Sequence, residues 1–190
     1  MGNHVKTVLG IDPGSLKTGY GIVQKSGNQY KHIENGTLYL EKEKNYLDKL
    51  TKLYQEIMVL IEKYHIDSMA IEDIFYYKNP RSVQKLSEVR GVALLCGGLK
   101  QIEVSQYTPL QVKQAVTGYG KATKDQVQVM ICKILGLKDR PEENASDGLA
   151  IALCHSQLIA NPIHEEIKQN QKQVKNVTRQ ELLKQANFYK

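Results

Sequence analysis

Long uninterrupted apolar runs are missing from this 190-residue sequence. A membrane-spanning helix needs about 20 consecutive, mostly apolar residues, and a secretory signal peptide needs a shorter apolar stretch near the N-terminus. Neither pattern is present. We therefore expect a protein that has no membrane anchor, is not exported and resides in the cytoplasm.

Cysteine is scarce as well. The three cysteines, Cys96, Cys132 and Cys154, are odd in number, far apart and free of any C-x-x-C pair. Disulfide frameworks use even sets of cysteines, and cysteine zinc sites use closely spaced pairs. The sequence thus argues against both, and the three thiols are interpreted as small core residues.

A strong charge imbalance is also lacking. The formal net charge is +6, from 26 basic and 20 acidic residues, and half of this excess lies in residues 161–190. A basic excess hints at a polyanionic partner such as nucleic acid. Because the main body carries only +3, the placement of individual charges must decide what it binds.

The pattern of apolar residues predicts one α/β domain over residues 1–160. Strands are expected over 5–11, 20–24, 30–40, 68–74 and 101–107. Helices are expected over 46–64, from 80 towards 97, from 109 to 118, from 123 to 136 and from 141 onwards. This order indicates an antiparallel meander followed by parallel strands, which gives a mixed five-stranded sheet flanked by helices. Residues 161–190 have the composition of a polar, basic tail that is mobile or partly helical.

Two acidic residues interrupt strands that are otherwise apolar. Asp12 ends the first strand directly before Pro13-Gly14, and Glu72 lies within the strand over 68–74. Taken alone, Asp12 is equally well explained as a turn-capping residue. A buried parallel strand, however, is expected to be apolar throughout. Two acids on neighbouring strands would repel each other unless a cation lies between them.

A third acidic element lies near the start of the last predicted helix. Asn144 and Asp147 are three residues apart and share one helix face. Acids at 142, 143 and 147 also have a simpler explanation, because the helix dipole favours negative charge at a helix start. Together with Asp12 and Glu72, these hard oxygen ligands predict a Mg²⁺ or Mn²⁺ site for phosphate chemistry.

Aromatic and basic residues follow the Glu72 strand. Within 75–81, Phe75, Tyr77, Lys78 and Arg81 suit stacking on unpaired bases beside phosphate contacts, although strand-end aromatics are more often core residues. The glycine-containing segment 118–124 adds cations and backbone donors at a helix start, where phosphates bind well. The cations in and beside this segment that we expect to contact phosphates are Lys113, Lys121 and Lys124.

Over residues 6–158, these motifs resemble the RuvC family of Holliday-junction resolvases. The matching blocks, in family order, are Gly10 to Gly14, Ile71-Glu72, Tyr77 to Ser82, Arg90-Gly91, Thr108-Pro109, Gln111 to Gln114, Gly118 to Lys124, Ala145 to Asp147 and Ala150 to Ala152. The resemblance implies an RNase H-like fold and a homodimer. It also implies Mg²⁺-dependent symmetrical nicking of two opposed strands of a four-way DNA junction, with branch-migration helicase proteins as partners.

The resemblance also assigns roles to individual positions. Asp12, Glu72 and Asp147 correspond to catalytic ligands of two Mg²⁺ ions, for which Mn²⁺ is expected to substitute. Phe75 corresponds to a residue that pushes against a base at the junction crossover. Lys113 and Lys124 correspond to lysines that contact DNA near the cut phosphate.

Two positions depart from the family pattern. Asn144 stands where the family usually has an acidic metal ligand; an amide oxygen can coordinate Mg²⁺ but contributes no charge. Gly148 stands where the family usually has alanine, which mildly weakens the helix. The change at Asn144 leaves open a second function, that of a junction-binding protein with weakened catalysis.

An enzyme of another class is also considered. The stretch over 12–19 resembles the first phosphate loop of actin-like kinases and ATPases, which need a second lobe of the same kind. The 190 residues provide only one lobe, and no G-x-x-x-x-G-K-[ST] loop is present. Nucleotide phosphotransfer is therefore the weaker reading.

Overall fold

The structure, a computed structural model, describes residues 5–73 and 80–159. By its internal packing the chain divides into two units, Met1–Ser156 and Gln157–Lys190. The predicted tail over 161–190 lies outside the described residues. Within the described part of the chain, no helix has the length and apolar character needed to cross a membrane.

Five strands form one mixed sheet in the order β3-β2-β1-β4-β5. The strands are β1 (Lys6–Asp12), β2 (Lys17–Ser26), β3 (Gln29–Tyr39), β4 (Ser68–Glu72) and β5 (Glu103–Tyr107). β1, β2 and β3 form an antiparallel meander, whereas β4 pairs in parallel with both β1 and β5. The predicted sheet type is confirmed, and β1 occupies its centre.

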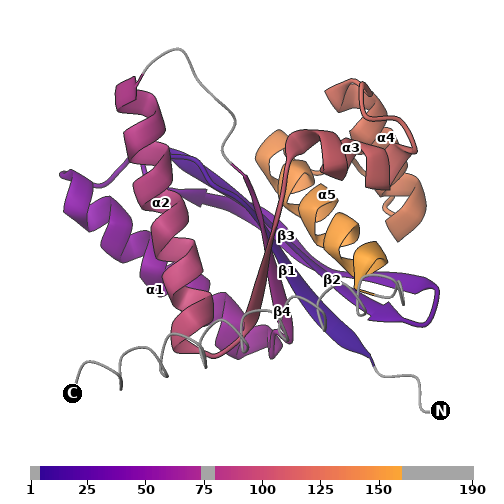
Figure 1. Ribbon diagram of the computed structural model, residues 1–190, viewed down its shortest axis with the longest axis horizontal. Coiled ribbons are helices and arrows are strands. Elements are labelled where there is room, and N and C mark those ends of the chain that lie inside the picture. Colours follow the sequence, from indigo (N-terminus) through magenta and orange to yellow (C-terminus); the bar gives the residue numbers. More distant parts are fainter. Residues whose placement is uncertain (1–4, 74–79, 160–190) are drawn as a thin grey trace, which may run out of the picture. The chain divides into compact units, whose positions relative to one another are not determined.

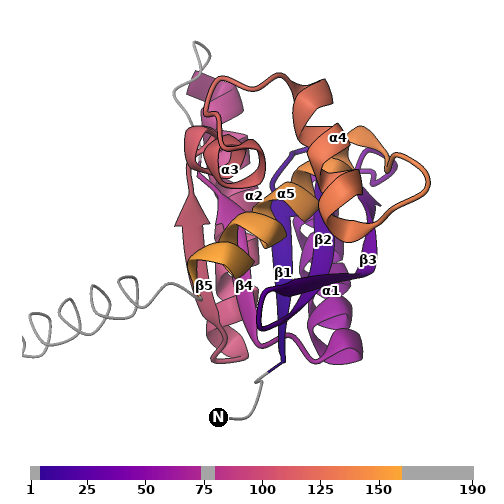
Figure 2. The same cartoon turned by 90° about the vertical axis from the view of Figure 1, so that its right-hand side faces the viewer.

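Helices cover both faces of the sheet (Figures 1 and 2). They are α1 (Tyr46–Tyr64), α2 (Pro80–Leu99), α3 (Pro109–Thr117), α4 (Lys124–Leu135) and α5 (Glu143–Leu158). α1 and α2 lie on one face, and α3, α4 and α5 lie on the other. Side chains on one face of the strands therefore pack against α1 and α2, and side chains on the other face pack against α3, α4 and α5.

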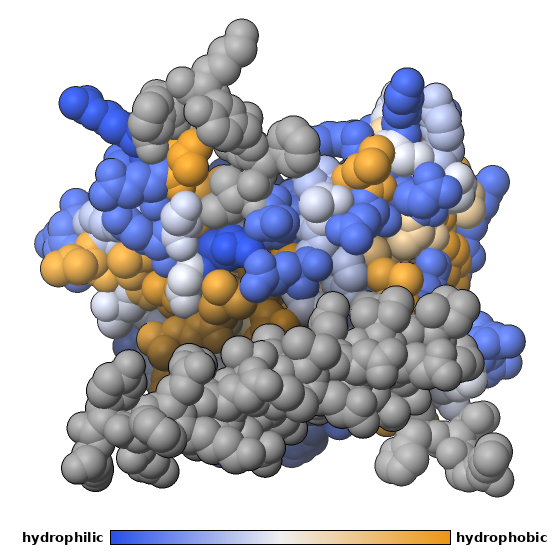
Figure 3. Space-filling view, in the orientation of Figure 1, coloured by the Kyte–Doolittle hydropathy of each residue, from blue (hydrophilic) through white to orange (hydrophobic). Residues whose placement is uncertain are grey.

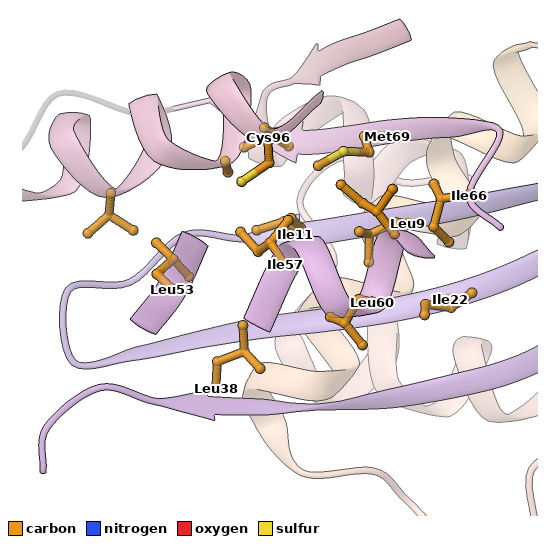
Figure 4. Close-up of a cluster of buried hydrophobic side chains, with 14 of the residues drawn as sticks. Leu9, Ile11, Ile22, Leu38, Leu53, Ile57, Leu60, Ile66, Met69 and Cys96 are labelled. Carbon is orange, nitrogen blue, oxygen red and sulfur yellow. The ribbon is translucent and has the colours of Figure 1, made fainter. Parts of the chain in front are cut away.

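The main hydrophobic core lies between the sheet and α1. Leu9 and Ile11 of β1 point towards Leu53 and Ile57 of α1, and all four side chains are buried (Figure 4). Side chains alternate along a strand, so the intervening residues of β1 face α5. This alternation assigns Gly10 and Asp12 to the opposite layer.

Capping residues define the helices of the second layer. Thr108 and Thr123 each form a capping box, at the start of α3 and of α4 respectively. Gly118 and Gly136 end these helices in the left-handed conformation that glycine tolerates best.

Several predicted boundaries were wrong by a few residues. The strand expected from 101 begins at Glu103, because Gln101 adopts a left-handed conformation and extends the turn after α2. The helix expected from 141 begins at Glu143, and β4 ends at Glu72. β2 is longer than expected, because its pairing with β3 continues from Lys17 to Ser26.

Candidate active site

Three carboxylates from separate elements line one cavity of about 490 Å³. Asp12 ends β1, Glu72 ends β4, and Asp147 lies in the second turn of α5. The remaining lining residues are Pro13, Gly14, Ser15, Ser82, Leu86, Pro109, Val112, Lys113, Lys124, Val127 and Ala150. The structure thus brings together the three acids and two of the lysines that the sequence singled out.

Parallel pairing of β1 with β4 places Asp12 beside Glu72. Ile11 pairs with Ile71 across the two strands, and the next residue of each strand is an acid. Ile11 and Ile71 belong to the core under α1, so Asp12 and Glu72 point to the layer of α5. The two carboxyl groups lie close enough for the charge of Glu72 to raise the pKa of Asp12.

Helix α5 approaches the strands closely because glycines leave room for its backbone. A Cβ on Gly10 would clash with the carbonyl oxygen of Gly148, and a Cβ on Gly148 would clash with the backbone of Tyr20. The backbones of α5, β1 and β2 are therefore in direct contact. Asp147, the neighbour of Gly148, is held in the same cavity as Asp12 by this contact.

Replacing Gly148 with alanine tests this contact. Helix propensity alone favours alanine by about 1 kcal/mol. An added Cβ against a rigid backbone costs about 1–3 kcal/mol, so we expect a net loss of up to about 2 kcal/mol. Urea denaturation measures this change in unfolding free energy. A gain in stability would show that α5 shifts without cost and that Gly148 is not required for the close packing.

The three acids have unusual protonation equilibria. Burial, followed by the charges of Glu72 and Asp147, raises the pKa of Asp12 to about 8. Burial and the charge of Asp147 raise the pKa of Glu72 to about 6. Burial also raises the pKa of Asp147, although Lys124 opposes this shift. The cluster therefore favours any added positive charge, whether a proton or a cation.

Lys124 enters this cluster from the start of α4. Its Nζ lies 2.5 Å from Glu143 Oε1 and 3.3 Å from Asp147 Oδ2. The hydrogen bond to Glu143, followed by the charge of Asp147, raises the pKa of Lys124. Lys113 of α3 lines the same cavity. Two ammonium groups thus lie near the acids, where they would also meet the charge of a phosphate.

The donor set suits a hard divalent cation, because carboxylate oxygens are the preferred ligands of Mg²⁺ and Mn²⁺. As they stand, the described residues contain no group of three or more His, Cys, Asp or Glu side chains that could hold a metal ion. Instead, the raised pKa of Asp12 favours a bound proton, and the ammonium of Lys124 contacts Asp147; both reduce the negative charge of the cluster. A divalent cation would supply the same compensation.

Asn144 does not line the cavity that Asp147 lines. It is half-buried one turn earlier on α5 and is not among the described residues that line the cavity. Its backbone carbonyl packs against Gly19 of β2, where a Cβ would clash. The three-residue spacing placed both residues on one helix face, but the first turn of α5 lies over β2 and the acids lie at β1 and β4.

Two of the other predicted DNA-contact residues lie outside the cavity lining. Arg81 and Lys121 are exposed and are not part of the cavity lining. Three others lie outside the described residues: Phe75, Tyr77 and Lys78.

One contact beside the site was not predicted. The hydroxyl groups of Thr37 and Tyr39 each donate a hydrogen bond of 2.9 Å to the Glu142 carboxylate. The sequence suggested only a charge effect on the helix dipole for this acid. The contact ties the residue before α5 to the edge strand β3 and helps to fix where Asp147 lies. It joins residues more than 100 positions apart, so no local sequence pattern predicts it.

Comparisons with known proteins agree with this site. The family model "Crossover junction endodeoxyribonuclease RuvC" matches residues 8–155. The protein of that name from Geotalea uraniireducens is 46% identical over 149 residues, which cover 78% of this chain and 87% of the relative. The one from Desulforamulus reducens is 47% identical over 151 residues, covering 79% and 93%.

Solved structures show the same relationship. The structure of Thermus thermophilus RuvC in complex with a Holliday junction substrate matches with a TM-score of 0.75 and 29% identity, covering 80% of this chain and 93% of that chain. The yeast mitochondrial Holliday junction resolvase, at 17% identity, shares the fold with a TM-score of 0.59. Because the family model spans most of the sequence and relatives exceed 40% identity, the chain belongs to the crossover junction endodeoxyribonuclease RuvC family.

Proposed function

We propose that this chain is an endonuclease that resolves four-way DNA junctions by nicking two opposed strands. The observation that carries the proposal is the cavity in which Asp12, Glu72 and Asp147 meet beside Lys113 and Lys124. Acids that favour a cation, next to lysines that favour a phosphate, are what metal-assisted cleavage of a phosphodiester requires. The family membership supports the same chemistry.

The acids of the cavity would hold Mg²⁺, two ions per site, with Mn²⁺ as a substitute. When bound, these ions activate a water molecule and stabilise the oxygen that leaves the scissile phosphate. Asp12, at the end of the central strand β1, is the proposed shared ligand, and Glu72 and Asp147 are the proposed further ligands. Products with 5′-phosphate and 3′-hydroxyl ends are expected.

The lysines act on the DNA. In the described arrangement Lys124 contacts Asp147 and Glu143, so its ammonium is already held at the cavity. A phosphate entering the cavity would compete for this ammonium and for Lys113. We propose that Phe75, Tyr77, Lys78, Arg81 and Lys121 extend the contact along the junction.

Symmetrical nicking requires a second active site, and α2 offers a surface for a second copy. Its exposed face carries Gly91, Leu95, Gly98 and Leu99, and nothing lies within 4 Å of a Cβ added to either glycine. Leu95 and Leu99 are 55% and 57% exposed. Figure 3 shows hydrophobic residues gathered in a band on the side where α1 and α2 lie. Small and apolar residues on one helix face suit close packing of two helices.

A charge on this face should therefore prevent pairing. Leu95→Glu is expected to convert a dimer into a monomer and to abolish paired nicking, while the fold persists because Leu95 contributes little to the core. Light scattering measures the mass, and thermal denaturation measures the fold. A dimer of unchanged stability in Leu95→Glu would contradict the placement of the interface on α2.

Asn144 is proposed as a neutral ligand, and its replacement tests this role. Asn144→Asp adds a negative charge, so half-maximal cleavage should need several-fold less Mg²⁺, and any preference for Mn²⁺ should shrink. A thermal melt without metal isolates the effect of the charge on the helix dipole, which is about 0.3–1 kcal/mol. An unchanged Mg²⁺ requirement would show that Asn144 is not a ligand.

The alternative function, binding of junctions without efficient cleavage, gains no support from the comparisons, because the curated relatives described above carry the nuclease name. The proposed location is the cytoplasm, and the proposed further partner is a branch-migration helicase complex.

Substrate class is tested with a four-way junction and a linear duplex of the same sequence. We expect nicking of the junction and little of the duplex. Equal cleavage of both would contradict junction specificity.

A further inference from the structure

Arg90 joins three elements at the edge of the candidate active site. It lies in the middle of α2, and its side chain is only 19% exposed. Its Nη2 donates a hydrogen bond of 2.9 Å to Asp73 Oδ1 and also contacts Gln106 Oε1. Asp73 directly follows β4, and Gln106 belongs to β5. One guanidinium group therefore links the ends of two neighbouring strands to a helix.

Both acceptors flank the backbone pair that contains Glu72. Glu72 pairs with Tyr107 across β4 and β5, Asp73 follows Glu72, and Gln106 precedes Tyr107. The amide of Asp73 also donates to the carbonyl of Tyr107 at 2.8 Å, which continues the pairing past the end of β4. Successive side chains along a strand point to opposite faces. The bond from Arg90 thus holds Asp73 on the α2 face, while Glu72 faces the cavity.

The same helix face reaches the cavity wall. Ser82, Leu86 and Arg90 are spaced by four residues and lie in a row along α2. Ser82 and Leu86 line the cavity, and Arg90 lies one turn further along the helix. Arg90 therefore also sets where this wall stands relative to the end of β4.

The orientation of the guanidinium group follows these two acceptors. Its Nε is buried and has no hydrogen-bond partner in the described part of the chain. Leaving a buried donor unpaired costs free energy. The contacts of Nη2 with Asp73 and Gln106 explain why the guanidinium group adopts this orientation although its Nε is left without a partner.

We propose that Arg90 is a positioning residue that fixes the Glu72 carboxylate for metal binding by clamping the ends of β4 and β5 with Asp73 and Gln106. This inference rests on the proposed role of Glu72 as a metal ligand. The clamp depends on geometry, because one side chain must reach both Asp73, directly after β4, and Gln106 on β5. A lysine at this position would carry the same charge but would lack the planar, forked donor group of arginine, so we do not expect lysine to restore the clamp.

The test compares Arg90→Met and Arg90→Lys with a matched control. Lys100, the residue directly after α2, forms an ion pair of 2.7 Å with Glu62 on α1. Lys100→Met therefore removes a similar pair far from the cavity. The measurements are Mn²⁺ binding to the DNA-free protein by calorimetry, kcat and KM for junction cleavage, and thermal stability in EDTA.

Both Arg90 variants are expected to bind Mn²⁺ about 5- to 10-fold more weakly and to lower kcat about 10-fold, because small misplacements of a catalytic group are costly. KM for the junction should change less than about twofold, and Lys100→Met should behave as wild type. Wild-type Mn²⁺ binding and kcat in Arg90→Met would overturn the proposal, as would full rescue by Arg90→Lys, which would indicate a role for charge alone.

Two further variants complete the design. If Arg90→Met does not fold, Gln106→Leu removes one arm of the clamp without a change in charge, and it should weaken Mn²⁺ binding about threefold. No change in that variant would overturn the proposal. Glu72→Gln separates the two hypotheses. Wild-type cleavage and Mn²⁺ binding in Glu72→Gln would refute the proposed metal site itself, whereas an inactive Glu72→Gln beside a fully active Arg90→Met refutes the clamp alone.

Discussion

Asp12→Asn is expected to lower junction cleavage by at least about 10³-fold, which corresponds to about 4 kcal/mol of activation free energy. Asp12 lies at the end of the central strand, and its pKa is raised by burial and by the charges of Glu72 and Asp147. An amide of the same shape removes the charge on which metal binding depends. The measurement is a single-turnover cleavage rate at saturating Mg²⁺.

Junction binding by this variant should persist. In EDTA the affinity of Asp12→Asn for the junction should equal or exceed that of wild type, because one negative charge facing the DNA is gone. Asp125→Asn is the matched control, since Asp125 is an exposed acid paired with Arg140 on the surface of α4. Cleavage by Asp12→Asn at the rate of the control would refute the assignment of the site.

Raising the pH should destabilise the metal-free protein. The pKa of Asp12 is about 8 in the folded protein, against an ordinary value of 3.8. Between these values the folded state holds a proton that the unfolded state has lost, so the free energy of unfolding falls as pH rises. Glu72 and Asp147 are shifted in the same direction. Each pKa unit corresponds to about 1.4 kcal/mol, so the loss should reach several kcal/mol between about pH 4 and pH 8.

Denaturant titrations in EDTA across this pH range measure the effect. Asp12→Asn should flatten most of the slope, because the group that retains the proton is gone. Adding Mn²⁺ at pH 8 should restore the stability of the wild-type protein, because the cation replaces the proton as the compensating charge. The same addition should not stabilise Asp12→Asn. A wild-type stability that rises with pH in EDTA would contradict the raised pKa values and the charge compensation inferred for the cavity.

The pair formed by Asp12 and Glu72 could be predicted from sequence because its determinants are local. Each acid ends an apolar strand, and parallel pairing of neighbouring strands brings their ends to one edge. The capping residue Thr123 likewise indicates the start of α4. In these cases a short stretch of sequence contains all the residues that determine the structure.

Other features depend on how helices pack, which no short pattern specifies. Asn144 shares a helix face with Asp147, but only the approach of α5 to Gly19 decides that Asn144 lies over β2. Lys124 was predicted to contact DNA, yet its contacts with Glu143 and Asp147 depend on the placement of α4 beside α5. Arg90 matched the family pattern, but its two partners lie on separate strands.

Nick mapping on a synthetic four-way junction tests the central claim most directly. Each of the four strands is labelled in turn and incubated with wild-type protein in Mg²⁺ or in EDTA. We predict nicks at symmetrical positions on two opposed strands, ends carrying 5′-phosphate that a ligase can reseal, and no cleavage in EDTA although binding persists. Binding without nicks in Mg²⁺ or Mn²⁺, or cleavage that continues in EDTA, would contradict a metal-dependent resolvase built on Asp12, Glu72 and Asp147.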